Sequence, residues 1–187
     1  MIDRTRPRVG RVAGELKTER LTLRPWRVED AEAALPVYGE SNVARWLSPA
    51  MATVADVDAM RVVLQRWIGE DAGLTTPAGR WAIEQTDDHR LVGGAVLLPL
   101  PPRGEDLEMG WQLHPDFWGR GYAAEAGRAV ARWAFDEGYD EILAVARPAN
   151  TRAQATARRI GMEWVGETEK YYDLRLQVFR LRPADLA

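Results

Sequence analysis

Hydrophobic residues recur with two periods along the chain, and each period predicts one kind of element. Alternation at every second position, as at Leu21 and Leu23, predicts a strand. Spacing of three to four residues, as at Ala126, Val130 and Ala134, predicts a helix. The predicted strands are 20–24, 81–85, 91–98, 107–113, 142–146, 163–169 and 174–181, and the predicted helices are 31–38, 54–68, 123–137 and 150–160.

The order of these elements indicates the fold class. Hairpins dominate the middle of the chain, and one β-α-β unit spans residues 107–147. We therefore expect an α/β (α+β) protein with a mixed, mostly antiparallel sheet and helices on both faces. Residues 1–17 are predicted to be a flexible N-terminal arm, and 18–187 a single domain without repeats or linkers.

Composition and charge exclude several classes of protein. The chain has 187 residues, 46% of them hydrophobic, which is typical of a folded globular protein. A formal net charge of −3 argues against a nucleic-acid partner, and the sequence contains no cysteine for a disulfide or thiolate site. No apolar run is long enough to span a membrane, and the first residues lack the apolar core of a signal peptide. We expect a cytoplasmic protein with no metal site and no membrane partner.

The stretch "WGRGYA" contains two glycines directly before a predicted helix. Gly119 and Gly121 allow backbone conformations that other residues resist, and a helix N-terminus offers unpaired N–H groups to an anion. Arg120 adds a cation between them. A plain tight turn is the alternative. The spacing with Ala124 also fits a dinucleotide-binding loop, but the strand after the helix ends in Arg147 rather than in an acid. A nucleotide phosphate loop would need a Lys-Ser/Thr pair that is absent after the glycines.

A longer stretch, "HPDFWGRGYAAEA", resembles the acetyl-CoA loop of the GNAT acetyltransferases, especially their RimJ/RimL-like branch. "TERLTLRPW" resembles the opening strand of that family, and "RPANTRAQATARRIGMEWVGE" resembles its later helix and strand. The resemblance implies a GNAT-type central sheet of about seven strands. The fourth and fifth strands, here about 107–113 and 141–147, are expected to splay apart and admit pantetheine.

The same resemblance implies acetyl-CoA as the cosubstrate, without a metal. Backbone N–H groups of the loop would hold the pyrophosphate, and the edge of strand 107–113 would pair with pantetheine. A bulge near Gly110 would aim an N–H at the thioester. The residues expected to bind the cofactor are Trp111, Gln112, Leu113, Trp118, Gly119, Arg120, Gly121, Tyr122, Ala123 and Asn150. For Asn150, a plain helix cap is an equal alternative.

Acetyl transfer to an amine needs a base, because an alkyl ammonium cannot attack a thioester. Glu108 is the first candidate and Glu84 the second, while His114 precedes Pro115 at the loop and has no assigned role in the branch. For each of these three side chains, a structural or solvated role is the alternative. The positions where relatives carry an acid for the leaving thiolate are Ala153 and Ala157 here. Tyr172, or its neighbour Tyr171, could substitute if their turn folds over the cleft, and ordinary aromatic side chains at a strand end are the alternative.

The acceptor is predicted only as a class. We expect a small-molecule or peptide amine. Trp26, Trp46, Trp67 and Trp81 come from segments that surround the acceptor pocket in the family, and a place in the core is the alternative for each. The protein is expected to be a monomer or a homodimer. Because both usual acids are missing, an acyl-CoA-binding sensor or interaction protein without efficient catalysis is the alternative function.

Overall fold

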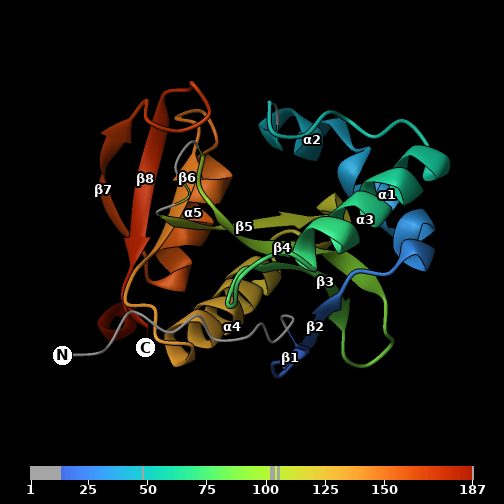
Figure 1. Ribbon diagram of the computed structural model, residues 1–187, viewed down its shortest axis with the longest axis horizontal. Coiled ribbons are helices and arrows are strands. Elements are labelled where there is room, and N and C mark those ends of the chain that lie inside the picture. Colours follow the sequence, from blue (N-terminus) through green and yellow to red (C-terminus); the bar gives the residue numbers. More distant parts are fainter. Residues whose placement is uncertain (1–13, 48, 102–103, 105, 187) are drawn as a thin grey trace.

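The computed structural model describes residues 14–47, 49–101, 104 and 106–186, and in them eight strands form one sheet that five α-helices cover (Figure 1). The strands are β1 (Leu16–Lys17), β2 (Leu21–Pro25), β3 (Gly79–Gln85), β4 (Leu91–Pro99), β5 (Leu107–Leu113), β6 (Ile142–Ala146), β7 (Glu163–Thr168) and β8 (Leu176–Leu181). The helices are α1 (Ala31–Tyr38), α2 (Ser41–Leu47), α3 (Val57–Asp71), α4 (Tyr122–Asp136) and α5 (Thr151–Ile160).

The sheet is mixed and mostly antiparallel, as predicted. Its strand order is β1-β2-β3-β4-β5-β6-β8-β7, and β5–β6 is its one parallel pair within the described residues. The strand beyond the predicted seven is β1, which pairs with β2 through Leu16 and Leu23. It belongs to the segment predicted to be a flexible arm, whose residues 1–13 lie outside the described part of the chain.

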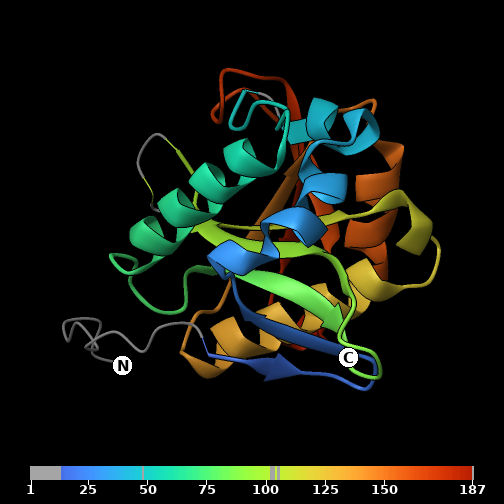
Figure 2. The same cartoon turned by 90° about the vertical axis from the view of Figure 1, so that its right-hand side faces the viewer.

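Helices cover both faces of the sheet (Figure 2). On one face α4 and α5 pack in the same core, where Ala126, Val130 and Ala134 of α4 are fully buried, as their spacing predicted. The two helices lie close together because residue 127 is glycine: a Cβ there would be 2.5 Å from Ile160 Cδ1. On the other face α1 and α3 enclose a second core. Helix α2 was not predicted, since seven residues are too few to reveal a helical period.

Three of the four tryptophans considered for the acceptor pocket lie in the two cores instead. Trp26, Tyr38 and Trp67 pack as a cluster with ring centroids 5.1–6.0 Å apart, and all three are buried. Trp81 is fully buried in the first core. These residues stabilise the two layers, and Trp46 is the member of the predicted set that faces a cavity.

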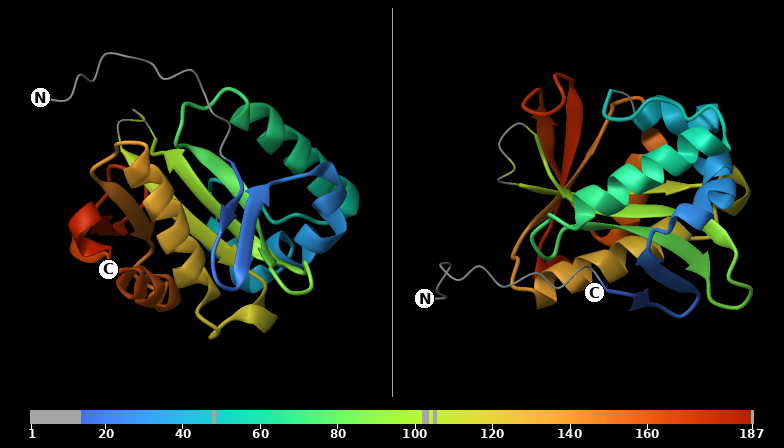
Figure 3. Two further views of the ribbon diagram at one scale, coloured as in Figure 1. Left: turned by 90° about the horizontal axis from the view of Figure 1, so that it is seen from below. Right: turned by 45° about the vertical axis from the view of Figure 1, so that its right-hand side comes forward.

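Strands β5 and β6 separate after a single paired position. Glu108 pairs with Leu143, and the two strands then diverge, which confirms the predicted splay (Figures 1 and 3). We call the gap beyond this pair the wedge. The register between β4 and β5 is continuous from Leu107 to Leu113, so the predicted bulge near Gly110 is wrong. One edge of β5 pairs with β4 along its whole length. The edge that faces β6 has no strand partner past Glu108, because β6 turns away from it.

Candidate active site

The loop between β5 and α4 adopts the backbone that its two glycines permit. Gly119 and Gly121 have φ angles of +78° and +81°, in the left-handed region that other residues rarely occupy. Gly121 is the N-cap of α4, and no side chain caps this end of the helix among the described residues. The first N–H groups of α4 are therefore available to an anion, which the helix dipole also favours.

The loop is held in place from two sides. The Trp118 indole donates a hydrogen bond to the Leu113 carbonyl at 2.9 Å, which anchors the loop to the end of β5. Arg20 donates to the Arg120 carbonyl at 3.0 Å, and its Nε donates to Glu125 in the first turn of α4 at 2.7 Å. The start of β2 thus braces the loop, so its N–H groups are preorganised.

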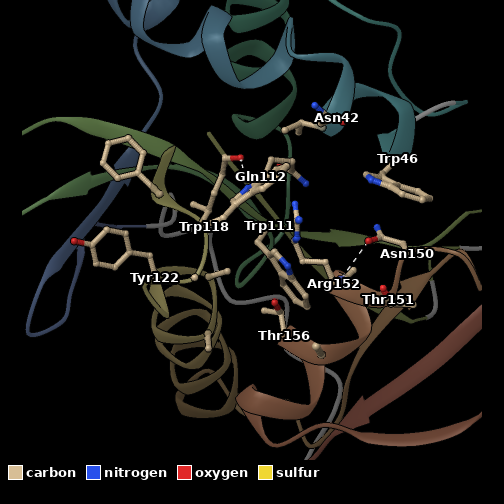
Figure 4. A pocket seen from close by; sticks show the side chains of 18 of the residues that line it. Asn42, Trp46, Trp111, Gln112, Trp118, Tyr122, Asn150, Thr151, Arg152 and Thr156 are labelled. Carbon is tan, nitrogen blue, oxygen red and sulfur yellow. Dashed lines mark hydrogen bonds between the residues drawn. The ribbon is translucent and has the colours of Figure 1, made fainter. Parts of the chain in front are cut away.

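A cavity of about 1140 Å³ opens at this loop and at the mouth of the wedge (Figure 4). All ten residues predicted to bind the cofactor, except Arg120, line it. It contains three arginines, Arg45, Arg152 and Arg159, and none of its lining residues is an aspartate or glutamate. In a chain whose acidic residues outnumber its basic ones, such a lining favours an anionic ligand.

Sequence reasoning missed several of the residues that two helices add to this cavity. Asn42 and Arg45 come from α2, which was not predicted, and so does Trp46, which the sequence names as an acceptor-pocket candidate. Arg152 reaches from α5 into the cavity, and its guanidinium carbon lies 3.6 Å from the centre of the Trp118 ring (Figure 4). Arg152 and Arg159 are seven residues apart on a predicted helix, so a common face could have been inferred from their spacing.

Asn150 fulfils the role of a helix cap and also lines the cavity. Its side-chain oxygen accepts a hydrogen bond from the Ala153 N–H at 3.2 Å, at the start of α5. Ala153 lines the cavity as well, whereas Ala157 is buried in the core. Neither alanine can supply a proton to a leaving thiolate.

Glu108 and Tyr172 lie in direct contact at the inner end of the wedge. The Tyr172 hydroxyl donates to the Glu108 carboxylate at 2.6 Å, so the turn between β7 and β8 folds over β5. Burial raises the pKa of Glu108 to about 7, and the hydrogen bond from Tyr172 offsets part of that rise. Burial also raises the pKa of Tyr172, as does the nearby Glu108 charge. Neither side chain lines the cavity at the loop. Of the β5 residues that do line it, Trp111 is the nearest to Glu108 in sequence.

The other candidate bases are engaged in structural contacts. Glu84 accepts from Arg24 Nε at 2.7 Å, and the same guanidinium holds Asp30 in a two-pronged ion pair. Arg24 is only 7% exposed, so these charges form a buried network. None of the three residues lines the cavity at the loop. His114 caps the short turn before Phe117, where its Nδ1 accepts from the Asp116 N–H at 3.2 Å.

This geometry has a counterpart among known protein families. The model of the family described as "Acetyltransferase (GNAT) domain" matches residues 20–163, more than half of the chain. The chain belongs to the GNAT acetyltransferases. It is therefore an acetyltransferase enzyme, and the fold and wedge described above are those expected for this family.

Known GNAT proteins resemble the chain over most of its length. It is 26% identical over 157 residues to the uncharacterized N-acetyltransferase YnaD of Bacillus subtilis, covering 83% of this chain and 86% of that protein. It is 28% identical over 166 residues to the FsC-acetyl coenzyme A-N(2)-transacetylase of Aspergillus fumigatus, covering 84% and 68%.

A solved structure shares the fold. The ribosomal-protein-S5-alanine acetyltransferase of Vibrio fischeri superposes with a TM-score of 0.71 at 15% identity, covering 92% of this chain and 98% of that one. Its name agrees with the RimJ/RimL-like branch, although this identity shows the fold alone.

Among the described residues, no cluster of three or more His, Asp or Glu side chains is arranged to hold a metal ion. Likewise, none of the helices in this part of the GNAT chain is long and apolar enough to cross a membrane.

Proposed function

We propose that this GNAT enzyme transfers the acetyl group of acetyl-CoA directly to a primary amine, within a complex of both substrates. The observation that supports this most is the arrangement along β5. An anion-binding loop lies at one end of the strand, an edge without a β6 partner follows, and the Glu108–Tyr172 pair lies at the other end. The name of the A. fumigatus relative also specifies acetyl coenzyme A and an N(2) position.

The cavity residues fit the parts of the cosubstrate. Backbone N–H groups between Trp118 and Ala123 would hold the pyrophosphate, because they lie at an uncapped helix N-terminus. The edge of β5 at Trp111–Leu113 offers backbone groups to the amides of pantetheine. When bound, acetyl-CoA supplies an acetyl thioester, which an uncharged amine can attack.

Glu108 acts as the general base in this proposal. Its pKa of about 7 leaves a useful fraction of carboxylate at neutral pH and still makes it a better proton acceptor than an ordinary glutamate. It removes a proton from the ammonium form of the acceptor, directly or through water. Tyr172 holds the carboxylate in place and can donate its hydroxyl proton toward the departing sulfur, which neither Ala153 nor Ala157 can do.

The alternative is a protein that binds acyl-CoA but does not turn it over efficiently. The alanines at positions 153 and 157 favour it, since the usual acids of the family are missing. A thiolate with a pKa of about 8.5 leaves without much assistance, so this absence does not prevent catalysis. A screen of amine acceptors with acetyl-CoA, which records CoA release, separates the two functions: turnover of any amine rejects the sensor.

Binding of the cosubstrate is tested by calorimetry with acetyl-CoA. We expect Gly121→Asp to abolish binding, because a carboxylate would occupy the anion site and the φ of +81° strains any side chain. Gly138→Asp is the matched control. It has the same charge, a φ of +92° and open space around it, but it lies beyond the other end of α4. Equal binding by the wild type and Gly121→Asp, or no binding by the wild type, contradicts the proposal.

A further inference from the structure

A second cavity of about 790 Å³ adjoins the first at the N-terminal half of α4. It lies between the segment around β1 and the outer surface of α4. Three residues line both cavities: Gly121 of the loop, Ala124 in the first turn of α4, and Arg159 near the end of α5. A long ligand bound at the loop can therefore continue from the first cavity into the second across this junction.

Three of the six arginines that line the two cavities have an acidic or aromatic partner. Arg20 is paired with Glu125, Arg45 stacks on Trp46, and Arg152 stacks on Trp118. By contrast, the other three arginines have no carboxylate or aromatic ring as a partner among the described residues; these are Arg128, Arg132 and Arg159.

Two of these three arginines meet at the junction. The Arg128 guanidinium donates a hydrogen bond to the backbone carbonyl of Arg159, which ties α4 to α5 and fixes the position of the half-buried Arg128. Arg159 itself lines both cavities, whereas Arg132 lies one turn further along α4 and lines only the second. Glu15, Glu19, Glu125 and Asp136 also line the second cavity, but within the described residues none of these carboxylates forms an ion pair with Arg128 or Arg159. Both guanidinium groups therefore remain available to a bound dianion.

We propose that Arg128 and Arg159 bind the ribose 3′-phosphate of CoA and make the enzyme select CoA over 3′-dephospho-CoA. This inference rests on the proposed function, because it places pyrophosphate at the loop. In CoA the adenosine lies on the opposite side of the pyrophosphate from pantetheine. If pantetheine enters the wedge, the adenosine and its phosphate extend outward over Ala124, to the junction. A terminal phosphate monoester matches the planar donor fork of arginine.

The test compares CoA with 3′-dephospho-CoA in calorimetric titrations of the full chain. We expect the wild type to bind CoA about tenfold more tightly, the effect of one charge-assisted contact in a solvated site. Arg128→Gln and Arg159→Gln should each lower the affinity for CoA toward that for 3′-dephospho-CoA, and leave the latter unchanged. Arg158→Gln is the matched control, since Arg158 is next in sequence but stacks on Phe179 instead.

The outcomes separate this inference from the proposed function. Equal wild-type affinity for both ligands overturns the phosphate site but leaves CoA binding intact. A preference for CoA that survives both substitutions also overturns it. If neither ligand binds, the proposed function fails together with the inference. Arg159 is exposed, so Arg159→Gln retains the fold even if Arg128→Gln loosens the contact between α4 and α5.

Discussion

The Tyr172 hydroxyl lies 2.6 Å from the Glu108 carboxylate, although the two residues are 64 positions apart in sequence. The turn that achieves this is strained: Tyr172 and Asp173 have φ angles of +57° and +53°, which residues other than glycine seldom adopt. Tyr171 compensates by donating to Asp106 at 2.6 Å while its ring is buried. Adjacent tyrosines in one turn thus contact two acids that are two residues apart, at the start of β5.

If Glu108 is the base, Glu108→Gln should reduce kcat by about 10² to 10⁴, the usual contribution of a general base. Binding of acetyl-CoA should not change, because the substitution keeps the shape of the side chain and its contact with Tyr172. Steady-state kinetics with an accepted amine, combined with calorimetry, measures both quantities. Glu163→Gln, an exposed residue of β7, is the control. A Glu108→Gln enzyme with nearly full kcat would show that the base is another group.

The same substitution has an effect on stability that needs no acceptor. The pKa of Glu108 rises from 4.5 to about 7 on folding, so between these values the folded protein binds more protons than the unfolded chain. Its stability must therefore decrease as the pH rises through this range. Glu108→Gln should be more stable than the wild type above pH 7, by up to about 3 kcal/mol, and should lose this advantage below pH 4.5. Denaturant unfolding at several pH values measures the difference, and a constant difference would contradict the raised pKa.

The sequence predicted the fold and most of the residues of the loop that line the first cavity, because both depend on local signals. Short apolar segments located β5 and β6, and the two glycines located the loop between β5 and α4. Helix α2 was not predicted because it is short, and β1 was not predicted because two residues cannot show an alternation.

The candidate catalytic residues depend on contacts between distant segments. Whether Tyr172 reaches Glu108 is decided by the turn after β7, and nothing in the local sequence shows where that turn points. Likewise, the pairing of Glu84 with Arg24 depends on the register between β2 and β3, so Glu84 could be named as a candidate but not placed.

Glu84 should prove to be a structural residue. Its carboxylate and that of Asp30 together balance the charge of the buried Arg24 guanidinium. The hydrogen bonds to Asp30 and Glu84 both raise the pKa of Arg24. Glu84→Gln removes one charge from this network, and we expect a loss of about 1–3 kcal/mol in the free energy of unfolding. Turnover per folded molecule should stay unchanged, as kinetics at a temperature well below the unfolding transition can show. A loss of kcat as large as that of Glu108→Gln, in a protein of wild-type stability, would instead assign Glu84 to catalysis.

The contact between Tyr172 and Glu108 should be visible in the pH dependence of catalysis. The hydrogen bond from Tyr172 lowers the pKa of Glu108, so Tyr172→Phe should raise it. Because a base works only when it is deprotonated, we expect kcat/KM of the wild type to increase with pH through about 7, and this increase should move to higher pH in Tyr172→Phe.

Tyr171→Phe provides the comparison for that profile. It keeps the buried ring but loses the hydrogen bond to Asp106, which anchors the turn without touching Glu108. We expect a smaller shift in the same direction, because the loosened turn holds Tyr172 in place for less of the time. The acceptor amine is identical in all three enzymes, so its own ionisation cancels when the profiles are compared. A Tyr172→Phe profile that coincides with the wild type would show that the 2.6 Å contact does not set the proton affinity of the base.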